Sequence, residues 1–278
     1  MFENRRLVIA TKHKKEGIIS PLIEKALKVK CFVPNNFDTD VFGTFSGEIE
    51  RKNDALTTVR SKCIVAMKHS NCDLGIASEG SFGEHPTVFF ANANEEFLIF
   101  IDQKNNLEIV VRELSLTTNF DGKRLESELD LVQFATKAQF PSHGLILKDA
   151  ENNFFECQKD FENLQQIIES YHYYINKFGV CYVETDMRAM HNPTRMLVIE
   201  KATQKLIEKI KSYCPKCQTP GFGVTSLVSG LRCEMCNMPT KSVLAYIYEC
   251  EKCKYILEKK YPNNKTSEDP TFCDFCNP

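Results

Sequence analysis

Several features that mark particular classes of protein are missing from this sequence. It has no tryptophan, and 35 Lys and Arg residues nearly balance 37 Asp and Glu residues, so the formal net charge is only −2. Such a balance provides no overall attraction to nucleic acid or to an anionic membrane surface. No apolar run approaches the roughly 18 residues that a membrane-spanning helix needs. These absences argue against a membrane protein and against binding of nucleic acid by overall charge.

The amino-terminal segment also lacks the features of an export signal. MFENRRLVIATKHKK contains only a short apolar stretch before its lysines, which is less than a secretory signal peptide requires. The composition, 42% hydrophobic and 26% charged, is that of a globular protein. We therefore expect a cytoplasmic protein with one large domain, or with one domain and a smaller appendage.

Cysteine is unusually abundant, and its spacing indicates metal binding. Of 13 cysteines, eight form four Cys-x-x-Cys pairs after residue 213. The pairs are Cys214/Cys217, Cys233/Cys236, Cys250/Cys253 and Cys273/Cys276. Two pairs supply the four thiolates of a tetrahedral zinc site, which is structural because no coordination position stays open. Disulfides are disfavoured in a chain without an export signal. The sequence predicts a double zinc-ribbon module at residues 212–278 that holds two structural zinc ions.

The gaps between consecutive pairs predict which of them share a zinc ion. They are 15, 13 and 19 residues long, and a four-cysteine zinc site usually has 15 to 20 residues between its two pairs. The first and last gaps fit this range and the middle gap is shorter. We therefore expect the first pair to join the second and the third to join the fourth, and an interleaved arrangement stays open.

The charge of the zinc module bears on its partners. Residues 212–278 contain eight basic and seven acidic residues, and each zinc ion with four thiolates adds a charge of about −2. Such a surface does not favour binding to the phosphates of nucleic acid. A protein partner for the zinc ribbons, or a role in completing the fold, is the better expectation.

The first 211 residues alternate between strand and helix patterns. We expect strands at 7–11, 30–34, 73–78 and 180–184, with a hairpin at 95–114 and a second hairpin-like segment at 144–158. Helices are expected at 16–28, at 125–138, at 161–177, after an N-cap at Asn53 or Asp54, and after Asn192. Alternation followed by hairpins predicts an α/β domain with a mixed, curved sheet and flanking helices.

Polar residues gather at strand ends and helix starts of this domain. In open α/β sheets, ligands bind beyond the carboxyl ends of the strands. We therefore expect four polar groups to converge there. The groups are Thr11, Lys12, His13, Lys14 and Lys15; Thr44, Ser46, Glu48, Glu50, Arg51 and Asp54; Ser78, Glu79, Ser81, Glu84 and His85; and Glu184, Asp186, Arg188, His191 and Arg195.

The residue types in these groups suit a phosphorylated ligand. Lysine and arginine bind anions, and arginine offers a planar fork for phosphate. Carboxylates such as Glu50, Asp54 and Glu79 suit Mg²⁺, which binds one or two carboxylates together with phosphate oxygens. A structural interpretation stays open for several members. Asp186 and Arg188 can form an internal ion pair, and the lysines after Thr11 can form a solvated helix start.

Two resemblances add to these patterns. The segments GTFSGEIER, ASEGSFGEHP, FPSHG and ETDMRAMHNPTRM, with the Cys-x-x-Cys tail that ends in CNP, resemble a bacterial family of unknown function. That family combines an α/β domain with a carboxyl-terminal double zinc ribbon. The resemblance covers nearly the whole chain and implies no activity.

The second resemblance is distant and covers residues 5–211. IATKHKK, NDALTTVRSKC, GIASEGSFG and ETDMRAMHNPTRMLVIEKA are similar, in order, to segments of the inosine/xanthosine triphosphate pyrophosphatases. The family's first phosphate loop corresponds to Thr11, with His13 where asparagine is usual. The resemblance implies an inosine-triphosphatase-like fold and hydrolysis of nucleotides. It further implies site roles for Asp54, Arg60, Glu79, Thr185, Thr194 and Arg195.

Together these patterns predict a Mg²⁺-dependent hydrolase of a nucleotide or another phosphorylated small molecule. The catalytic candidates are Asp54, Glu79 and Asp186, and the Mg²⁺ candidates are Glu50, Asp54 and Glu79. Substrate-binding candidates are Thr11, Lys12, His13, Arg51, Arg60, Arg188, His191, Thr194 and Arg195. The alternative is a non-catalytic protein that senses a nucleotide and uses its zinc ribbons to bind protein or nucleic acid.

Overall fold

A computed structural model describes residues 1–39, 54–88, 90–152 and 154–278. The chain divides into two compact units, Met1–Leu206 and Ile207–Pro278. The boundary lies within helix α5, Pro193–Lys211. The predicted site residues Glu50 and Arg51 lie outside the described residues.

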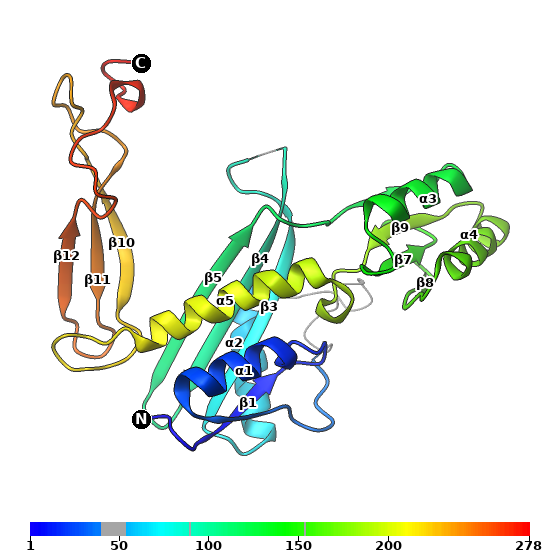
Figure 1. The fold of residues 1–278 in the computed structure, drawn as a ribbon, viewed down its shortest axis with the longest axis horizontal. Coiled ribbons are helices and arrows are strands. Elements are labelled where there is room, and N and C mark those ends of the chain that lie inside the picture. Colours follow the sequence, from blue (N-terminus) through cyan, green and yellow to red (C-terminus); the bar gives the residue numbers. More distant parts are fainter. Residues whose placement is uncertain (40–53, 89, 153) are drawn as a thin grey trace. The chain divides into compact units, whose positions relative to one another are not determined.

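The main sheet of the first unit is mixed, as the alternation of patterns predicted. Its strand order is β2-β1-β3-β4-β5 (Figure 1). Strand β1 is parallel to both β2 and β3, whereas β3, β4 and β5 form an antiparallel meander. The strands are β1 (Arg6–Ala10), β2 (Lys30–Phe32), β3 (Leu74–Glu84), β4 (Asn92–Asp102) and β5 (Leu107–Ser115).

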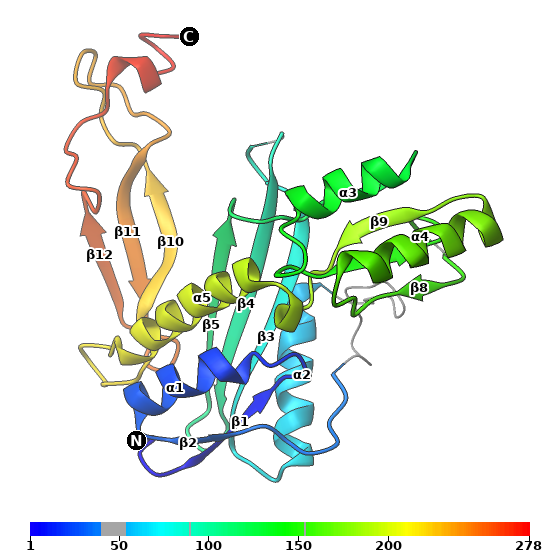
Figure 2. The same ribbon diagram turned by 45° about the vertical axis from the view of Figure 1, so that its right-hand side comes forward.

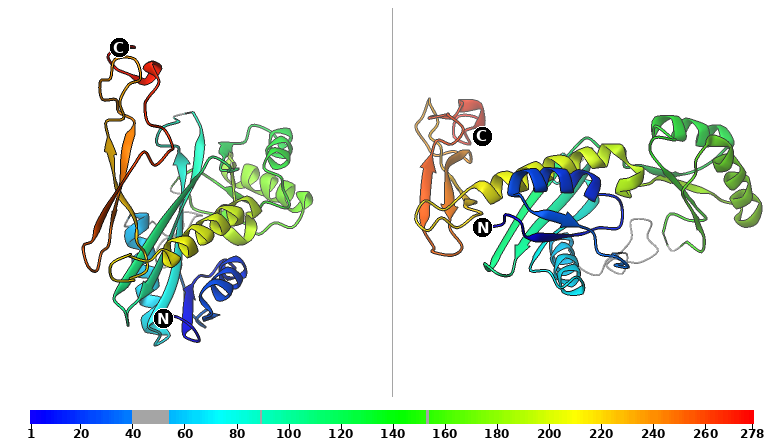
Figure 3. Two further views of the ribbon diagram at one scale, coloured as in Figure 1. Left: turned by 60° about the vertical axis from the view of Figure 1, so that its left-hand side comes forward. Right: turned by 60° about the horizontal axis from the view of Figure 1, so that its bottom comes forward.

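Helices cover both faces of this sheet. On one face, Val8, Ala10, Ala77 and Ile99 form a buried cluster with Val59 and its neighbours on α2 (Ala55–His69). Because side chains alternate along a strand, Leu7, Ile9 and Ile76 are buried on the opposite face. Helix α1 (Glu16–Leu27) and α5 lie over that face, and α2 lies under the other (Figure 3).

The chain reverses its direction of winding at β1. The connection through α1 leads from β1 to β2 on one side, and the connection through α2 leads from β2 to β3 on the other. Where consecutive connections of a parallel sheet run in opposite directions, a crevice opens outside the carboxyl ends of the two central strands. The fold therefore places a candidate ligand site beyond the ends of β1 and β3.

Strand β3 is longer than its sequence pattern predicted. We expected the strand to end at residue 78 and the segment from residue 79 to be a loop, but β3 continues to Glu84. The reason is its partner: all eleven residues of β3 pair with β4, from Leu74 opposite Asp102 to Glu84 opposite Asn92. Backbone pairing with a long neighbouring strand thus outweighs the tendency of the two glycines in this segment to weaken a strand.

A second, antiparallel sheet of the first unit has the order β6-β9-β7-β8. Its strands are β6 (Gly122–Arg124), β7 (Leu145–Lys148), β8 (Cys157–Gln158) and β9 (Tyr182–Thr185). Helices α3 (Glu128–Lys137) and α4 (Leu164–Phe178) pack on one face through Leu131, Phe134, Ile167 and Tyr174. The predicted hairpin at 144–158 is confirmed as β7 and β8, which pair in antiparallel fashion.

The second unit contains a three-stranded antiparallel sheet, β10-β11-β12 (Figure 2). Its strands are β10 (Gly223–Ser229), β11 (Val243–Glu249) and β12 (Ile256–Lys260). The sequence predicted β11 as the strand that leads into the third cysteine pair. It did not predict β10 or β12. Each of the three strands connects one Cys-x-x-Cys pair to the next.

Candidate functional site

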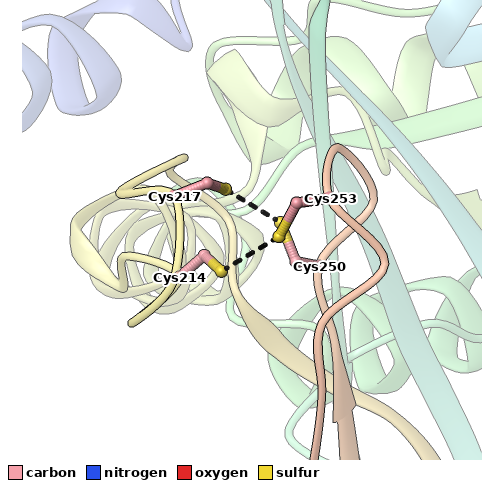
Figure 4. Close-up of side chains that lie close together, drawn as sticks. All are labelled: Cys214, Cys217, Cys250 and Cys253. Carbon is pink, nitrogen blue, oxygen red and sulfur yellow. Dashed lines mark hydrogen bonds between the residues drawn. The ribbon is translucent and has the colours of Figure 1, made fainter.

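The eight cysteines of the second unit form two groups of four. Cys214 and Cys217 face Cys250 and Cys253, with Sγ–Sγ distances of 3.6 Å from Cys214 to Cys253 and from Cys217 to Cys250 (Figure 4). The remaining four cysteines form the second group. Sγ–Sγ distances there are 3.9 Å from Cys233 to Cys276 and 3.6 Å from Cys236 to Cys273.

The pairing of the cysteines is therefore interleaved, and our preferred sequential pairing was wrong. Strand β10 separates the first Cys-x-x-Cys pair from the second and has seven residues, a length of roughly 23 Å. Consecutive pairs thus lie at opposite ends of the sheet. Because the strands are antiparallel, the first and third pairs return to one end and the second and fourth to the other.

Both groups fit a zinc ion. Four thiolates at the Zn–S distance of 2.3 Å in a tetrahedron lie about 3.8 Å apart, close to the distances here, whereas disulfide sulfurs lie about 2.05 Å apart. The local backbone supports the geometry. The residue after the second cysteine has a left-handed conformation in three of the pairs, at Gln218, Asn237 and Lys254. The second unit can therefore hold two zinc ions.

In the first unit, polar and charged side chains from five elements meet beyond the end of β1, beside the part of β3 that continues past it. We call this set the switch-point cluster. It comprises Lys15 at the start of α1, Lys62 of α2, Ser78 and Glu79 of β3, Glu96 of β4 and Arg195 of α5. Their positions follow from the register, because Ala10 opposite Ala77 is the last pair between β1 and β3. The side chains from Ser78 onward are therefore no longer covered by β1.

The cluster reaches both faces of the sheet around the end of β1. Glu79 points toward α2, where Lys62 forms an ion pair with it. Ser78 points to the opposite face and accepts a hydrogen bond from Lys15 Nζ at 2.9 Å. On that same face the Nε of Arg195 donates to Glu96 at 2.5 Å, and both side chains are 0% exposed. Charges on both faces thus act on Lys15.

The amine of Lys15 is the most strongly perturbed group of the cluster. Burial lowers the pKa of Lys15 to about 7, and the positive charges of Arg195 and Lys62 act in the same direction. The carboxylates of Glu96 and Glu79 oppose this shift. Desolvation disfavours a buried ammonium group, and the positive end of α1 disfavours it further. Lys15 can therefore bind or release a proton near neutral pH.

Gly80 allows the buried ion pair between Arg195 and Glu96 to form. A Cβ atom at Gly80 would lie 2.5 Å from Glu96 Oε1 and would also overlap the guanidinium of Arg195. We expect Gly80→Ala to lower the free energy of unfolding by about 1–3 kcal/mol, the usual cost of overpacking. Denaturant unfolding measures the change. Gly83→Ala in the same strand is the matched control, because a Cβ there meets no atom within 4 Å. Equal stability of the two variants would contradict the interpretation.

A cleft lies beyond the ends of β1 and β2, and its lining includes Glu16, the residue that follows Lys15. Its volume is about 430 Å³, and its walls include Thr11, Lys12, Val33, Phe37 and Asp38. Thr11 is buried, and the exposed Lys12 forms an ion pair of 2.9 Å with Asp38. A cleft of this size is within the range of small-molecule sites. His13, in the same loop, is half-buried, and its backbone N–H donates to Thr11 Oγ1 at 3.3 Å.

Two residues to which the resemblance assigned site roles, Asp54 and Arg60, form contacts outside the switch-point cluster. Asp54 is exposed and is the N-cap of α2, where it accepts hydrogen bonds from the backbone N–H and the hydroxyl of Thr57. Arg60 forms a two-pronged ion pair with Glu108 of β5. In the described ranges, neither contacts the switch-point cluster through a hydrogen bond or ion pair that we observe. Glu79 and Arg195 do belong to the cluster.

The fourth polar group forms a network of its own. The buried carboxylate of Asp186 accepts hydrogen bonds from the backbone N–H, Nε and Nη2 of Arg188, and Nη2 also contacts Asp160 at 2.6 Å. His191 Nε2 lies 3.0 Å from Asp160. This is the internal ion pair that the sequence left open. Separately, Thr194 Oγ1 lies 2.9 Å from His143 Nε2, and burial lowers the pKa of His143. The guanidinium of Arg188 thus neutralises the carboxylates of Asp186 and Asp160.

Sequence reasoning placed Lys15 and Ser78 in the converging polar groups without selecting them as site residues, and it missed Lys62 and Glu96 altogether. Lys62 had a detectable signal, because it lies among the apolar stripe positions Val59, Cys63 and Ala66 of α2. Glu96 directly follows Asn94 and Glu95 in β4, so its sequence context does not mark it as a site residue. Lys15 is one of three lysines in five positions. Nothing local distinguishes it from Lys12 and Lys14, both exposed.

Comparisons with known proteins give a family and little else. A search of curated proteins found no match. Among solved structures, the chain is similar to the crystal structure of protein VC0702 from Vibrio cholerae. The identity is 8%, the match covers 74% of this chain and 94% of that chain, and the TM-score is 0.32. That similarity is too low to define the fold. Among the described residues, none of the helices combines the length and the hydrophobicity of a membrane-spanning segment.

A family model described as "Domain of unknown function (DUF6671)" matches residues 62–278. The match extends from α2 through the rest of the first unit and includes all eight zinc-site cysteines of the second. Because it spans well over half of the chain, the protein belongs to the DUF6671 family.

Proposed function

We propose that the first unit hydrolyses a phosphate ester or phosphoanhydride bond of a nucleotide or another phosphorylated small molecule. The observation that carries the proposal is the convergence of Lys15, Lys62, Glu79, Glu96 and Arg195 at the switch point of the sheet. Ligands of open α/β sheets bind at this place. The distant sequence resemblance to inosine/xanthosine triphosphate pyrophosphatases is in keeping with the proposal, and we further propose that the first unit has a fold of their kind.

The chemistry of the cluster is suited to phosphate. Phosphoryl transfer depends mainly on positioning and on neutralising the charge of the phosphate oxygens. Lys15 and Lys62 offer ammonium groups on the two faces of β3, and Arg195 adds a buried guanidinium. In the proposal, Lys15 contacts the phosphate, Arg195 positions Glu96, and Glu79 orients or activates the attacking water. Bound Mg²⁺ would supply further neutralisation of the phosphate charge.

The described residues do not by themselves form a Mg²⁺ site of the predicted composition. Glu79 is already paired with Lys62, and Asp54 caps α2. Among the described residues, the groups of three or more potential ligands are the two zinc sites and the set Asp160, Asp186 and His191. No step of the proposal is therefore assigned to a metal held by Asp54 and Glu79.

Turnover of a nucleotide panel tests the proposal directly. The full-length, zinc-loaded protein is incubated with nucleoside triphosphates, with and without Mg²⁺ or Mn²⁺, and released phosphate and pyrophosphate are measured. We expect product with at least one substrate, and we expect Glu79→Gln to reduce the rate about 100-fold or more. Glu156→Gln is the matched control, because Glu156 is also paired with a lysine but lies away from the cluster, beside Lys177 on α4.

The outcomes separate the proposal from its main alternative. Product that is lost in Glu79→Gln but retained in Glu156→Gln supports hydrolysis. A nucleotide-dependent rise in melting temperature without product would favour a non-catalytic sensor of the same ligand. If the panel gives neither product nor a thermal shift, the proposed function is rejected.

A further inference from the structure

We propose that one end of the second unit is a docking surface for a basic amphipathic helix of a partner protein. This end holds the zinc site formed by Cys233, Cys236, Cys273 and Cys276. The surface consists of four large apolar side chains beside these cysteines, which we call the knuckle patch: Met235, Met238, Phe272 and Phe275.

The two Cys-x-x-Cys turns of this zinc site share one pattern. Each has an acidic residue followed by a large apolar residue between its cysteines, in Cys-Glu-Met-Cys at 233–236 and Cys-Asp-Phe-Cys at 273–276. Met235 is 76% exposed and Phe275 is 63% exposed. Phe272 and Met238, which flank the two turns, are 66% and 40% exposed. Single exposed apolar residues are common, but a group of four around one metal site marks an interaction surface.

The turns of the other zinc site have the opposite character. They read Cys-Pro-Lys-Cys at 214–217 and Cys-Glu-Lys-Cys at 250–253, with an exposed lysine where the knuckle patch has methionine or phenylalanine. The aromatic residues at that site, Phe222 and Tyr248, pack against its cysteines. Zinc binding therefore does not require an exposed apolar residue in these turns. Phenylalanine and methionine are enriched in protein interfaces, which gives the knuckle patch a role in protein contact.

The charge around the knuckle patch determines the kind of partner. Residues 231–242 and 265–278 contain three basic and four acidic side chains. Zinc with four thiolates adds about −2, so the net charge is about −3. Within the described residues, Glu234 is exposed and has no ion pair. Asp274 forms an exposed ion pair of 2.9 Å with Lys241, and such pairs are weak enough to be exchanged for a partner's cation.

An amphipathic helix with basic residues matches this surface. Its apolar residues form one stripe, and its lysines or arginines lie on both sides of that stripe. The stripe would contact Met235 and Phe275, while the basic residues would approach Glu234 and Asp274. One contact inside the unit has the same chemistry, because the Nζ of Lys265 lies 5.9 Å from the centre of the Phe272 ring. Aromatic faces attract cations in this way.

Binding of model peptides to the full-length, zinc-loaded protein tests the proposal. The probe is a fluorescently labelled peptide of about 18 residues, composed of leucine and lysine and designed as a basic amphipathic helix. One comparison peptide has glutamate in place of every lysine, and another has serine in place of every leucine. We expect fluorescence anisotropy to show binding of the leucine–lysine peptide only, because the other two lack either the positive charge or the apolar stripe.

Substitutions in the second unit locate the binding surface. We expect Phe275→Ser and Met235→Ser each to weaken binding about tenfold or more, as for central interface residues. Ile256→Ser is the matched control, because Ile256 is 59% exposed but lies beside the other zinc site, and we expect a change of no more than about twofold. Glu234→Gln should weaken binding about two- to fivefold. Native mass spectra of each variant show whether both zinc ions are retained.

Several results would overturn the proposal. These are equal binding of the lysine and glutamate peptides, no binding at protein concentrations up to about 100 µM, or equal effects of Phe275→Ser and Ile256→Ser. A dimer of the wild type that Phe275→Ser dissociates would overturn it as well, because the occupant would then be a second copy of the chain. The peptide comparison does not depend on any variant, so it decides the matter even if Phe275→Ser loses zinc.

Discussion

Removal of zinc is expected to unfold Ile207–Pro278 and to leave the first unit folded. The second unit has a small apolar core around Phe222 and Tyr248, and the cysteines form part of it. A unit of this size cannot bury enough apolar surface to be stable alone. Structural zinc supplies about 10–16 kcal/mol of binding free energy per site in zinc-finger peptides. Treatment with a strong chelator, followed by limited proteolysis, should therefore cleave this unit selectively. Resistance of the chelated unit would contradict the prediction.

Cysteine substitutions test the interleaved pairing by counting zinc ions in native mass spectra. The double variant Cys214→Ser with Cys250→Ser damages only one site, so we expect one zinc ion to remain. Cys214→Ser with Cys233→Ser damages both sites, and we expect both ions to be lost. Sequential pairing requires the opposite result for these two variants. The experiment therefore distinguishes the two arrangements without regard to activity.

Loss of the Arg195 side chain is expected to cause the second large effect. Arg195 and Glu96 form an ion pair in which both side chains are fully buried. Arg195→Leu leaves the carboxylate of Glu96 without its partner in a dry environment. Breaking a buried ion pair in this way costs about 3–5 kcal/mol of the free energy of unfolding. Arg195 Nη1 also contacts the Met187 carbonyl at 2.5 Å, so this contact is lost with it.

A double variant and a surface control complete this measurement. Arg195→Leu combined with Glu96→Leu removes both charges, and we expect it to be more stable than Arg195→Leu alone. Lys177→Met breaks an exposed ion pair with Glu156, and such pairs contribute about 0–1 kcal/mol. Denaturant unfolding of all four proteins gives the comparison. If Arg195→Leu costs no more than Lys177→Met, the buried pair does not have the predicted importance.

The sequence was most informative where a local pattern sets the chemistry. Four Cys-x-x-Cys pairs identify zinc ligands because each pair forms its own tight turn. Strand and helix periods predicted β1, α1, α2, β4 and β5, since side-chain burial follows the local backbone. Asp54 was one of two expected N-caps of α2, and its side chain does accept from Thr57.

The site depended on contacts between distant segments, for which the local pattern holds little information. Lys12 and Lys15 belong to the same run of lysines, yet one is exposed and the other is buried against Ser78. That difference arises because β3 continues past the end of β1 and brings Ser78 beside the start of α1. The fold could be anticipated in outline, but the members of the cluster could not be separated from their neighbours.

By itself, the sequence determined which cysteines can bind zinc, the mixed α/β class and most of the secondary structure, because these depend on residue spacing within one segment. Only the tertiary structure decided which cysteines share an ion and which charges surround Lys15. The physical reason is the same in both cases. In the zinc unit, each antiparallel strand returns the chain to the end of the sheet where the previous strand began, so alternate cysteine pairs meet. In the first unit, β3 is longer than β1 and its last side chains are not covered by β1. In both cases the pairing of strands, and not the spacing along the chain, decides which residues are close together.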